Sequence, residues 1–105
     1  MAIRSYRDLE VWKAAVDMVE MTYRVTSEFP ADEKYGLKSQ MQRASVSIAA
    51  NIAEGYGRSH RREYLNYLSM ANGSLAEYET HLIIATRVKF LNRNDATLIW
   101  ERAKR

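Results

Sequence analysis

The side chains in this sequence with the most evident chemistry are two histidines and the carboxylates near them. His81 follows Glu77 by four residues and Glu79 by two, and His60 precedes Glu63 near the start of a predicted helix. A di-iron site in a helical bundle needs a Glu-x-x-His pair on each of two helices, and neither histidine completes one. The chain has no cysteine, which excludes thiolate zinc sites. We therefore expect neither a metal centre nor a cofactor.

Glu54 is the candidate for acid–base chemistry, because it is the one acidic residue of a basic segment and follows Asn51 by about one helical turn. An enzyme centred on Glu54 and His60 is one interpretation, and a structural ion pair between Glu54 and Arg58 is the other. The Gly-Tyr-Gly sequence at 55–57 is too short for a phosphate-binding glycine loop. We favour the ion pair and expect that the protein is not an enzyme.

Positive charge is concentrated in the middle of the chain. Residues 34–62 hold six basic residues and one acidic residue (6 − 1 = +5), whereas residues 1–33 sum to −3 and residues 63–105 to +1. Guanidinium groups suit phosphate recognition, and Tyr56 is placed to stack on an unpaired base. We predict that this segment binds RNA or another single-stranded nucleic acid. The predicted contacts are Arg58, Arg61 and Arg62, helped by Lys34, Lys38 and Arg43.

The size of the chain limits what one copy can do. Its 105 residues predict a single domain, residues 1–105, and a domain of this size buries only roughly 60–65% of its unfolded surface. Its net charge of +3 is low for a nucleic-acid module, so a protein–protein scaffold is the alternative function. A ring of subunits would sum the charges. No apolar stretch suits a signal peptide or a membrane span, so we expect a cytoplasmic location.

Apolar periodicity predicts an all-α fold, an up-and-down antiparallel four-helix bundle with left-handed packing. The first helix, about residues 8–29, has two apolar stripes with the same spacing. The stripe expected to face the core comprises Leu9, Trp12, Val16, Val19 and Tyr23. The second stripe comprises Val11, Ala15, Met18, Thr22, Val25 and Phe29. It is either part of a wide core-facing surface or a subunit interface.

The second helix is predicted from Leu37 to Ala53, with a left-handed glycine cap at residues 55–57. Its small residues predict close packing against neighbouring helices. Its core seam is expected to be Leu37, Met41, Ala44, Ile48 and Ile52.

The third helix is predicted to begin near Ser59 as its N-cap and to continue through Gly73. Glycine inside a helix costs roughly 1 kcal/mol relative to alanine, so we expect a close helix contact at Gly73. The seam of this helix is Leu68, Ala71, Leu75, Tyr78, Leu82 and Ala85. A fourth helix of about eleven residues, capped by Asn94 or Asp95, is too short to cover both of its neighbours.

Several motifs carry a resemblance to a known family. The most specific is Asn51-Ile52-Ala53-Glu54-Gly55. The others are Tyr6, Leu9, Val11 and Trp12, then Tyr35-Gly36-Leu37, Ser39-Gln40, Arg43-Ala44 and Ser47-Ile48, and finally Glu63-Tyr64, Leu68, Ala71, Gly73-Ser74-Leu75-Ala76-Glu77, Glu79 and Leu82. Together they resemble the four-helix-bundle proteins encoded in intervening sequences of bacterial 23S ribosomal RNA genes. The chain departs from the pattern at Ala49, where the family often has proline, and in its short fourth helix.

The resemblance implies a closed four-helix bundle that assembles into a homopentameric ring and has no known catalytic site. It also implies kinship with the accessory protein of diversity-generating retroelements, a basic ring that binds nucleic acid and a reverse transcriptase. The resulting hypothesis is a non-enzymatic homo-oligomer that binds nucleic acid through a basic surface assembled across subunits. The alternative is an assembly module whose partner is a protein and which has no nucleic-acid role.

Overall fold

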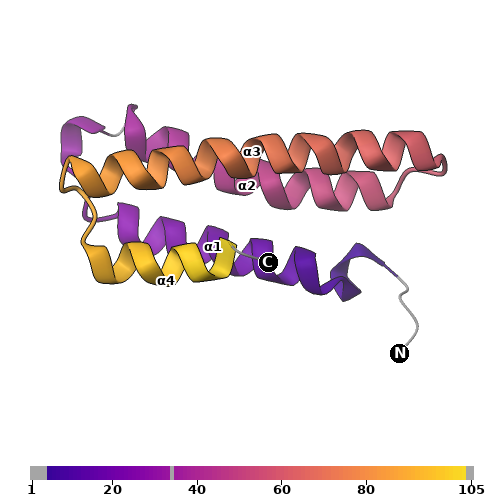
Figure 1. Ribbon diagram of the computed structural model, residues 1–105, viewed down its shortest axis with the longest axis horizontal. Helices are drawn as coiled ribbons and strands as arrows, with labels where there is room; N and C mark the ends of the chain where they lie inside the picture. The colour runs from indigo at the N-terminus through magenta and orange to yellow at the C-terminus, as the bar shows by residue number, and fades with distance from the viewer. Residues whose placement is uncertain (1–4, 34, 104–105) are drawn as a thin grey trace.

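The computed structural model describes residues 5–33 and 35–103, which form a bundle of four α-helices (Figure 1). Successive helices run in opposite directions, and the bundle measures 43 × 25 × 19 Å. The helices are α1 (Glu10–Thr26), α2 (Leu37–Tyr56), α3 (Arg61–Arg87) and α4 (Arg93–Ala103), with short 3₁₀ helices at Tyr6–Asp8 and Ala31–Glu33. The predicted all-α, up-and-down fold is therefore confirmed. No helix among the described residues is long and apolar enough to cross a lipid bilayer.

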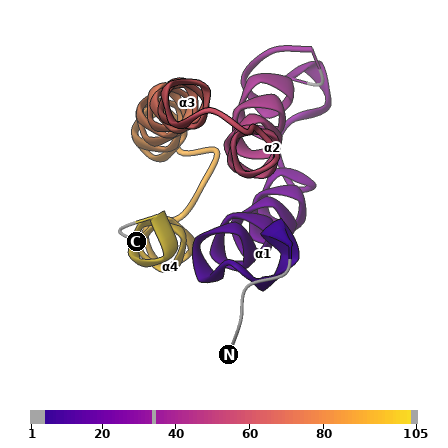
Figure 2. The ribbon, with the colours of Figure 1, turned by 90° about the vertical axis from the view of Figure 1, so that its right-hand side faces the viewer.

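Each helix packs against two neighbours, so an end-on view shows the four helices at the corners of a square (Figure 2). The most extensive contact is between α2 and α3, and α1 packs between α2 and α4. The contact between α3 and α4 closes the square. This arrangement places the first helix, α1, beside the last helix, α4.

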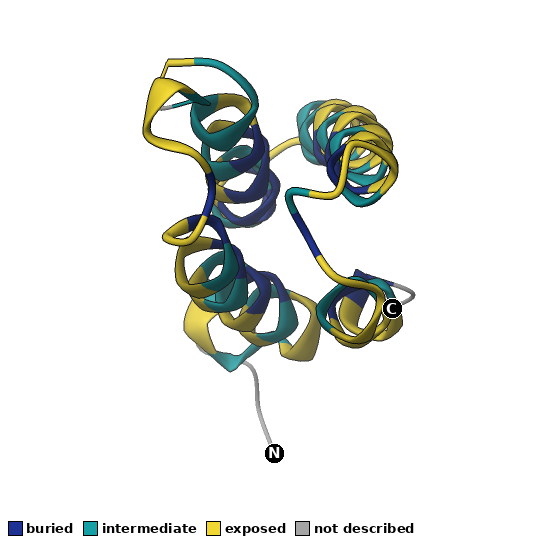
Figure 3. Ribbon diagram, turned by 90° about the vertical axis from the view of Figure 1, so that its left-hand side faces the viewer, coloured by how far each residue is buried: buried dark blue, intermediate teal, exposed yellow. Residues whose placement is uncertain are grey.

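The core lies on the sides of the helices that face one another (Figure 3). Its largest side chains with almost no exposure are Tyr78, Met41, Leu82 and Ile99. Moving such a side chain out of water contributes about 1.5–3 kcal/mol to stability. The predicted seams of α2 and α3 are confirmed, with Leu37, Leu68 and Leu75 only partly buried. The buried seam residues are Met41, Ala44, Ile48 and Ile52 on α2, and Ala71, Tyr78, Leu82 and Ala85 on α3.

The core surface of α1 is wider than one stripe, because the second stripe supplies the buried residues while Leu9, Trp12 and Val16 of the first stripe pack against the core only partly buried. Met18 and Thr22 of the second stripe are buried, whereas Trp12 of the first stripe is half-buried and Tyr23 is 48% exposed. The Trp12 ring packs edge-on against Tyr6 of the first 3₁₀ helix, with ring centroids 5.2 Å apart. The two stripes share the same spacing, so periodicity could identify both but could not choose between them.

Two helix starts also differ from the predictions. The first residue of α3 is Arg61, so the residue before it is His60 and not Ser59, and His60 makes no side-chain capping hydrogen bond. At the start of α4, the side-chain oxygen of Asn92 accepts a hydrogen bond from the backbone N–H of Asp95 at 2.8 Å. Asn92 is therefore the cap, in place of Asn94 or Asp95.

Glycine has a different role in α2 from the predicted one. The helix continues through Gly55 to Tyr56, and the φ angle of Gly57 is −78°, so no left-handed cap forms. A Cβ atom on Gly55 would lie 2.8 Å from Cβ of Tyr67 on α3, whereas a Cβ atom on Gly73 would have no described atom within 4 Å apart from its chain neighbours and the nearby backbone of its own helix. The close contact between α2 and α3 therefore occurs at Gly55, and the contact predicted at Gly73 is absent from the described residues.

Candidate nucleic-acid interface

Three of the predicted contact residues lie together at one end of the bundle, where residues 57–60 connect α2 to α3 (Figure 1). Arg61 and Arg62 are exposed in the first turn of α3, and Arg58 is exposed in the connection. The N-terminus of a helix is the positive end of its dipole, so arginine is electrostatically unfavourable there. An anion would offset this repulsion and would also accept hydrogen bonds from the free backbone N–H groups of that turn.

Arg58 is held against α3 by an aromatic ring. Its Nη2 atom donates a hydrogen bond to the Tyr67 hydroxyl at 2.7 Å, and its Cζ atom lies 4.8 Å from the centroid of the Tyr67 ring. The same Nη2 atom is 3.8 Å from Oε2 of Glu54, which confirms the predicted structural ion pair. The two side chains are 42% and 58% exposed, so this pair contributes little to stability.

The contribution of Tyr67 could not be predicted from the sequence. Tyr67 follows Arg58 by nine residues, and no helical spacing relates a connecting residue to a ring in the second turn of the next helix. Arg61 and Arg62, by contrast, form no ion pair with any residue that the structure describes. The cluster therefore combines one oriented guanidinium group with two that are free of acidic partners.

Of the remaining predicted contacts, the two that the structure describes, Lys38 and Arg43, do not join this cluster. Lys38 lies in the first turn of α2, about 27 Å along the helix from Tyr56 at 1.5 Å per residue. Arg43 is exposed between these two positions, and Lys34 lies outside the described residues. One copy of the chain therefore presents a cluster of three arginines and, separately, the two more distant cations.

Asn51 and the residues around it serve the packing of α2 on α3. The Asn51 Nδ2 atom donates hydrogen bonds to the carbonyl oxygen of Ser47 at 2.9 Å and to Oγ of Ser47 at 3.1 Å. The Ser47 hydroxyl in turn shares a hydrogen bond of 2.9 Å with the Ser74 hydroxyl on α3. These contacts explain the Asn-Ile-Ala-Glu-Gly sequence structurally, since Ile52 is buried in the core and Gly55 admits Tyr67.

The histidines do not build a metal centre within the described part of the chain. No group of three or more histidine, aspartate or glutamate side chains there is arranged to hold an ion. His81 Nε2 lies 3.3 Å from Glu77 Oε2, and the buried Nδ1 atom of His81 has no hydrogen-bond partner in the described structure. This pair would supply two ligands, fewer than a zinc site needs.

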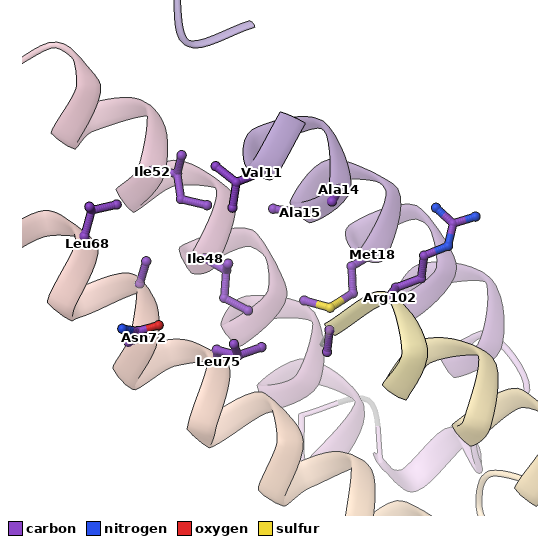
Figure 4. A pocket seen from close by; sticks show the side chains of 12 residues that line it. Val11, Ala14, Ala15, Met18, Ile48, Ile52, Leu68, Asn72, Leu75 and Arg102 are labelled. Atoms are coloured by element: carbon purple, nitrogen blue, oxygen red, sulfur yellow. The ribbon is translucent and has the colours of Figure 1, made fainter. Parts of the chain in front are cut away.

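A second surface feature is an apolar groove of about 240 Å³ beyond the end of α4 (Figure 4). Because α4 ends at Ala103, it covers only part of the length of α3, and the core-facing Val11 is left 47% exposed. The apolar side chains that line the groove include Val11, Ala14, Ile48, Ile52, Leu68 and Leu75. The groove confirms that the short fourth helix does not cover its neighbours, and it contains no carboxylate or histidine among its lining residues.

These features define an antiparallel four-helix-bundle protein with an arginine cluster at one end. Residues 7–105 match the model of the 23S rRNA-intervening sequence protein family, and the chain belongs to this family. A crystal structure of a protein of unknown function, from the S23 ribosomal protein family of Bacteroides thetaiotaomicron, has a similar fold. The TM-score is 0.80 with 21% sequence identity, over 90% of this chain and 88% of that one. No curated protein sequence matches the chain significantly.

Proposed function

We propose that this protein is a non-enzymatic homo-oligomer that binds RNA or another single-stranded nucleic acid through Arg58, Arg61 and Arg62. The observation that supports this proposal is the pair Arg61 and Arg62 in the first turn of α3, without acidic partners among the described residues. Their positive charge costs stability at the positive end of the helix dipole, and a bound phosphate would offset that cost.

Assembly is the second part of the proposal, because one copy carries a net charge of only +3. A ring, which we propose to be a homopentamer, would place one arginine cluster from each subunit on a shared surface. Such a ring agrees with the proposed kinship with the accessory protein of diversity-generating retroelements. Lys34, Lys38 and Arg43 are proposed to contribute where the bound strand runs along α2.

The test is a salt titration of the binding of a fluorescently labelled single-stranded RNA. We expect log affinity to fall linearly with log salt concentration, with a slope of about −0.7 for each phosphate contact on a single strand. The double variant Arg61→Glu with Arg62→Glu should lose at least about tenfold in affinity and show a shallower slope. The matched control is Arg87→Glu with Arg93→Glu, which changes the net charge equally but lies at the opposite end of the bundle, where α3 ends and α4 begins.

The control decides whether the cluster is the site. If the two double variants lose affinity equally, the effect is one of net charge and the cluster is not the binding site. If the wild-type protein binds no RNA even at low salt, the alternative of a protein–protein scaffold replaces the proposal. That alternative is favoured by one observation, the apolar groups exposed on α3, where Met70 is 53% exposed.

A further inference from the structure

The three arginines of the cluster differ in their surroundings. The side chains of Arg61 and Arg62 make no hydrogen bond, ion pair or ring contact with any residue that the structure describes. Arg58 makes all three kinds of contact, through the hydroxyl and the ring of Tyr67 and through the carboxylate of Glu54. Arginines in such different environments are not expected to bind the same part of a nucleic acid.

Arg58 is the least suited of the three to hold a phosphate group. Oε2 of Glu54 lies 3.8 Å from its Nη2 atom, and this carboxylate would repel a phosphate and offset part of the guanidinium charge. The same Nη2 atom already donates a hydrogen bond to Tyr67 at 2.7 Å. Arg61 and Arg62 have no such competitor among the described residues, and they lie in the first turn of α3, where the backbone N–H groups lack partners within the helix. Phosphate is therefore expected at that turn.

The surroundings of Arg58 suit a flat ligand better. A guanidinium group is planar, and it stacks on aromatic rings through dispersion and through the attraction between a cation and π electrons. The Cζ atom of Arg58 lies over the Tyr67 ring at 4.8 Å from its centroid, yet the Arg58 side chain is still 42% exposed. Unpaired bases of RNA stack on guanidinium planes as they do on aromatic rings. The side of Arg58 that faces away from Tyr67 therefore offers a surface for one base.

The packing of α2 on α3 fixes the ring that supports Arg58. Tyr67 is half-buried, and its Cβ atom lies 2.8 Å from the place where Gly55 would carry a Cβ atom. The absence of a side chain at Gly55 therefore lets Tyr67 lie close against α2. The ring, its hydroxyl group and Glu54 together restrict the guanidinium of Arg58. A base that stacks on it then immobilises less side-chain motion than it would on a free arginine.

We propose that an unpaired base of the bound strand stacks on Arg58, on the side facing away from Tyr67, while Arg61 and Arg62 bind the phosphates next to it. This inference rests on the proposed function and divides the cluster into a base-binding residue and two phosphate-binding residues. Arg58 and Arg61 are three residues apart, so their Cα atoms are at most about 11 Å apart and adjacent nucleotides can reach both. Tyr67 is a positioning residue, and the ligand is a strand with accessible bases rather than any polyanion.

The test compares two fluorescently labelled strands of equal length at one salt concentration, an oligouridylate and the same sugar–phosphate backbone without bases. The wild-type protein should bind the oligouridylate more tightly. Arg58→Lys keeps the charge but removes the plane, so it should lower the affinity for the oligouridylate by about fivefold or more, while the affinity for the base-free strand falls much less. The matched control is Arg61→Lys, which should lower both affinities by the same factor because a phosphate contact does not depend on the base.

A second variant tests the positioning role of Tyr67. Tyr67→Phe keeps the ring and its packing at Gly55 but removes the hydroxyl that accepts the hydrogen bond from Arg58. We expect a selective loss of affinity for the oligouridylate, smaller than that of Arg58→Lys, with an unchanged dependence on salt because no charge is altered. The control is Tyr64→Phe, one turn earlier on α3, since the Tyr64 hydroxyl makes no hydrogen bond within the described chain.

The outcomes separate this inference from the proposed function. A wild-type protein that binds neither strand at low salt contradicts both. If the wild type binds the two strands equally, or if Arg58→Lys weakens both by the same factor, nucleic-acid binding stands and the stacked base is wrong. A selective loss in Arg61→Lys would also overturn the inference, because it would assign the base to Arg61. Equal behaviour of Tyr67→Phe and Tyr64→Phe would overturn the positioning role of Tyr67.

Discussion

The hydroxyl group of Tyr78 on α3 shares a hydrogen bond with Oγ1 of Thr22 on α1, across the diagonal of the bundle (Figure 2). Both residues are completely buried, and Oγ1 of Thr22 also donates a hydrogen bond to the carbonyl oxygen of Met18 at 2.7 Å. Tyr78 is therefore the donor to Thr22. This bond joins two diagonally placed helices whose described residues make no direct backbone contact, and it satisfies two polar groups in the core.

Replacing Tyr78 with phenylalanine should destabilise the protein moderately. Tyr78→Phe removes one buried hydrogen bond but leaves Thr22 bonded to Met18, so we expect a loss of about 1 kcal/mol in the free energy of unfolding. Urea unfolding at neutral pH and fixed protein concentration measures the loss. Tyr23→Phe, at a half-exposed position on α1, is the control and should change stability little. Equal losses in both variants would refute a special role for the buried bond.

The same tyrosine predicts how stability changes in alkali. Burial raises the pKa of Tyr78 from 10.0 to about 12, because the core disfavours the charged phenolate. The charged form is the deprotonated one, so the unfolded chain loses this proton at lower pH than the folded chain. The contribution is complete below pH 10 and is lost as the pH rises towards 12, by roughly 1.4 kcal/mol for each unit between the two values.

A comparison with Tyr78→Phe isolates this contribution from the titration of other groups. Unfolding of the two proteins should be measured at neutral pH and again between pH 10 and 12. The stability advantage of the wild type should shrink over the alkaline interval. An advantage that stays constant across that interval would show that the folded and unfolded states release the Tyr78 proton equally.

A methyl group at Gly55 should be poorly tolerated although the residue is helical. Its Cβ atom would lie 2.8 Å from Cβ of Tyr67 and 3.4 Å from the carbonyl oxygen of Tyr64. We expect Gly55→Ala to separate α2 from α3 and to cost about 1–3 kcal/mol, in spite of its better helix propensity. Thermal unfolding measures the change. Stabilisation by this substitution would mean that the two helices do not approach as closely as described.

The cap of α4 offers a local test of the short fourth helix. Asn92 accepts a hydrogen bond from the backbone N–H of Asp95, and its Nδ2 atom donates to Oδ2 of Asp95 at 3.1 Å. Asn92→Ala should cost about 1 kcal/mol and shorten α4 from its first turn. Asn94→Ala, within the first turn, should cost less because Asn92 holds the cap. Circular dichroism and urea unfolding of the two variants test whether Asn92→Ala destabilises the protein more than Asn94→Ala.

The amino-acid pattern was sufficient for the number, order and direction of the helices, because seams such as Met41, Ala44 and Ile48 repeat at helical spacing. It was insufficient where two stripes repeat equally well. On α1 the choice between the Trp12 stripe and the Met18 stripe depends on which neighbours cover each side, and that is a property of the tertiary structure. The family could be predicted from the sequence because the family's short motifs are present in this chain at matching spacings.

The two glycines show a different limit of sequence reasoning. Gly55 and Gly73 both lie inside helices, and a mid-helix glycine indicates either a stop or a close contact. Which meaning applies depends on how closely the neighbouring helix approaches the glycine. A Cβ atom built on Gly55 would lie 2.8 Å from the Tyr67 Cβ, and no such neighbour lies beside Gly73. The layout of the candidate site was likewise only partly predictable from the sequence. The sequence brings Arg58, Arg61 and Arg62 together because they lie within five residues of one another, but their distance from Lys38 follows from the length of α2.

The early end of α4 has a consequence for local stability along the bundle. Among the described residues, α4 ends at Ala103 beside the middle of α1, and α2 and α3 extend past α1 at the end that holds Arg61 (Figure 1). Backbone amides in that section have fewer packed neighbours, so they should exchange hydrogen with solvent sooner than those around Tyr78. Slower exchange of the first amides of α3 in the presence of RNA would then locate the bound strand without any substitution.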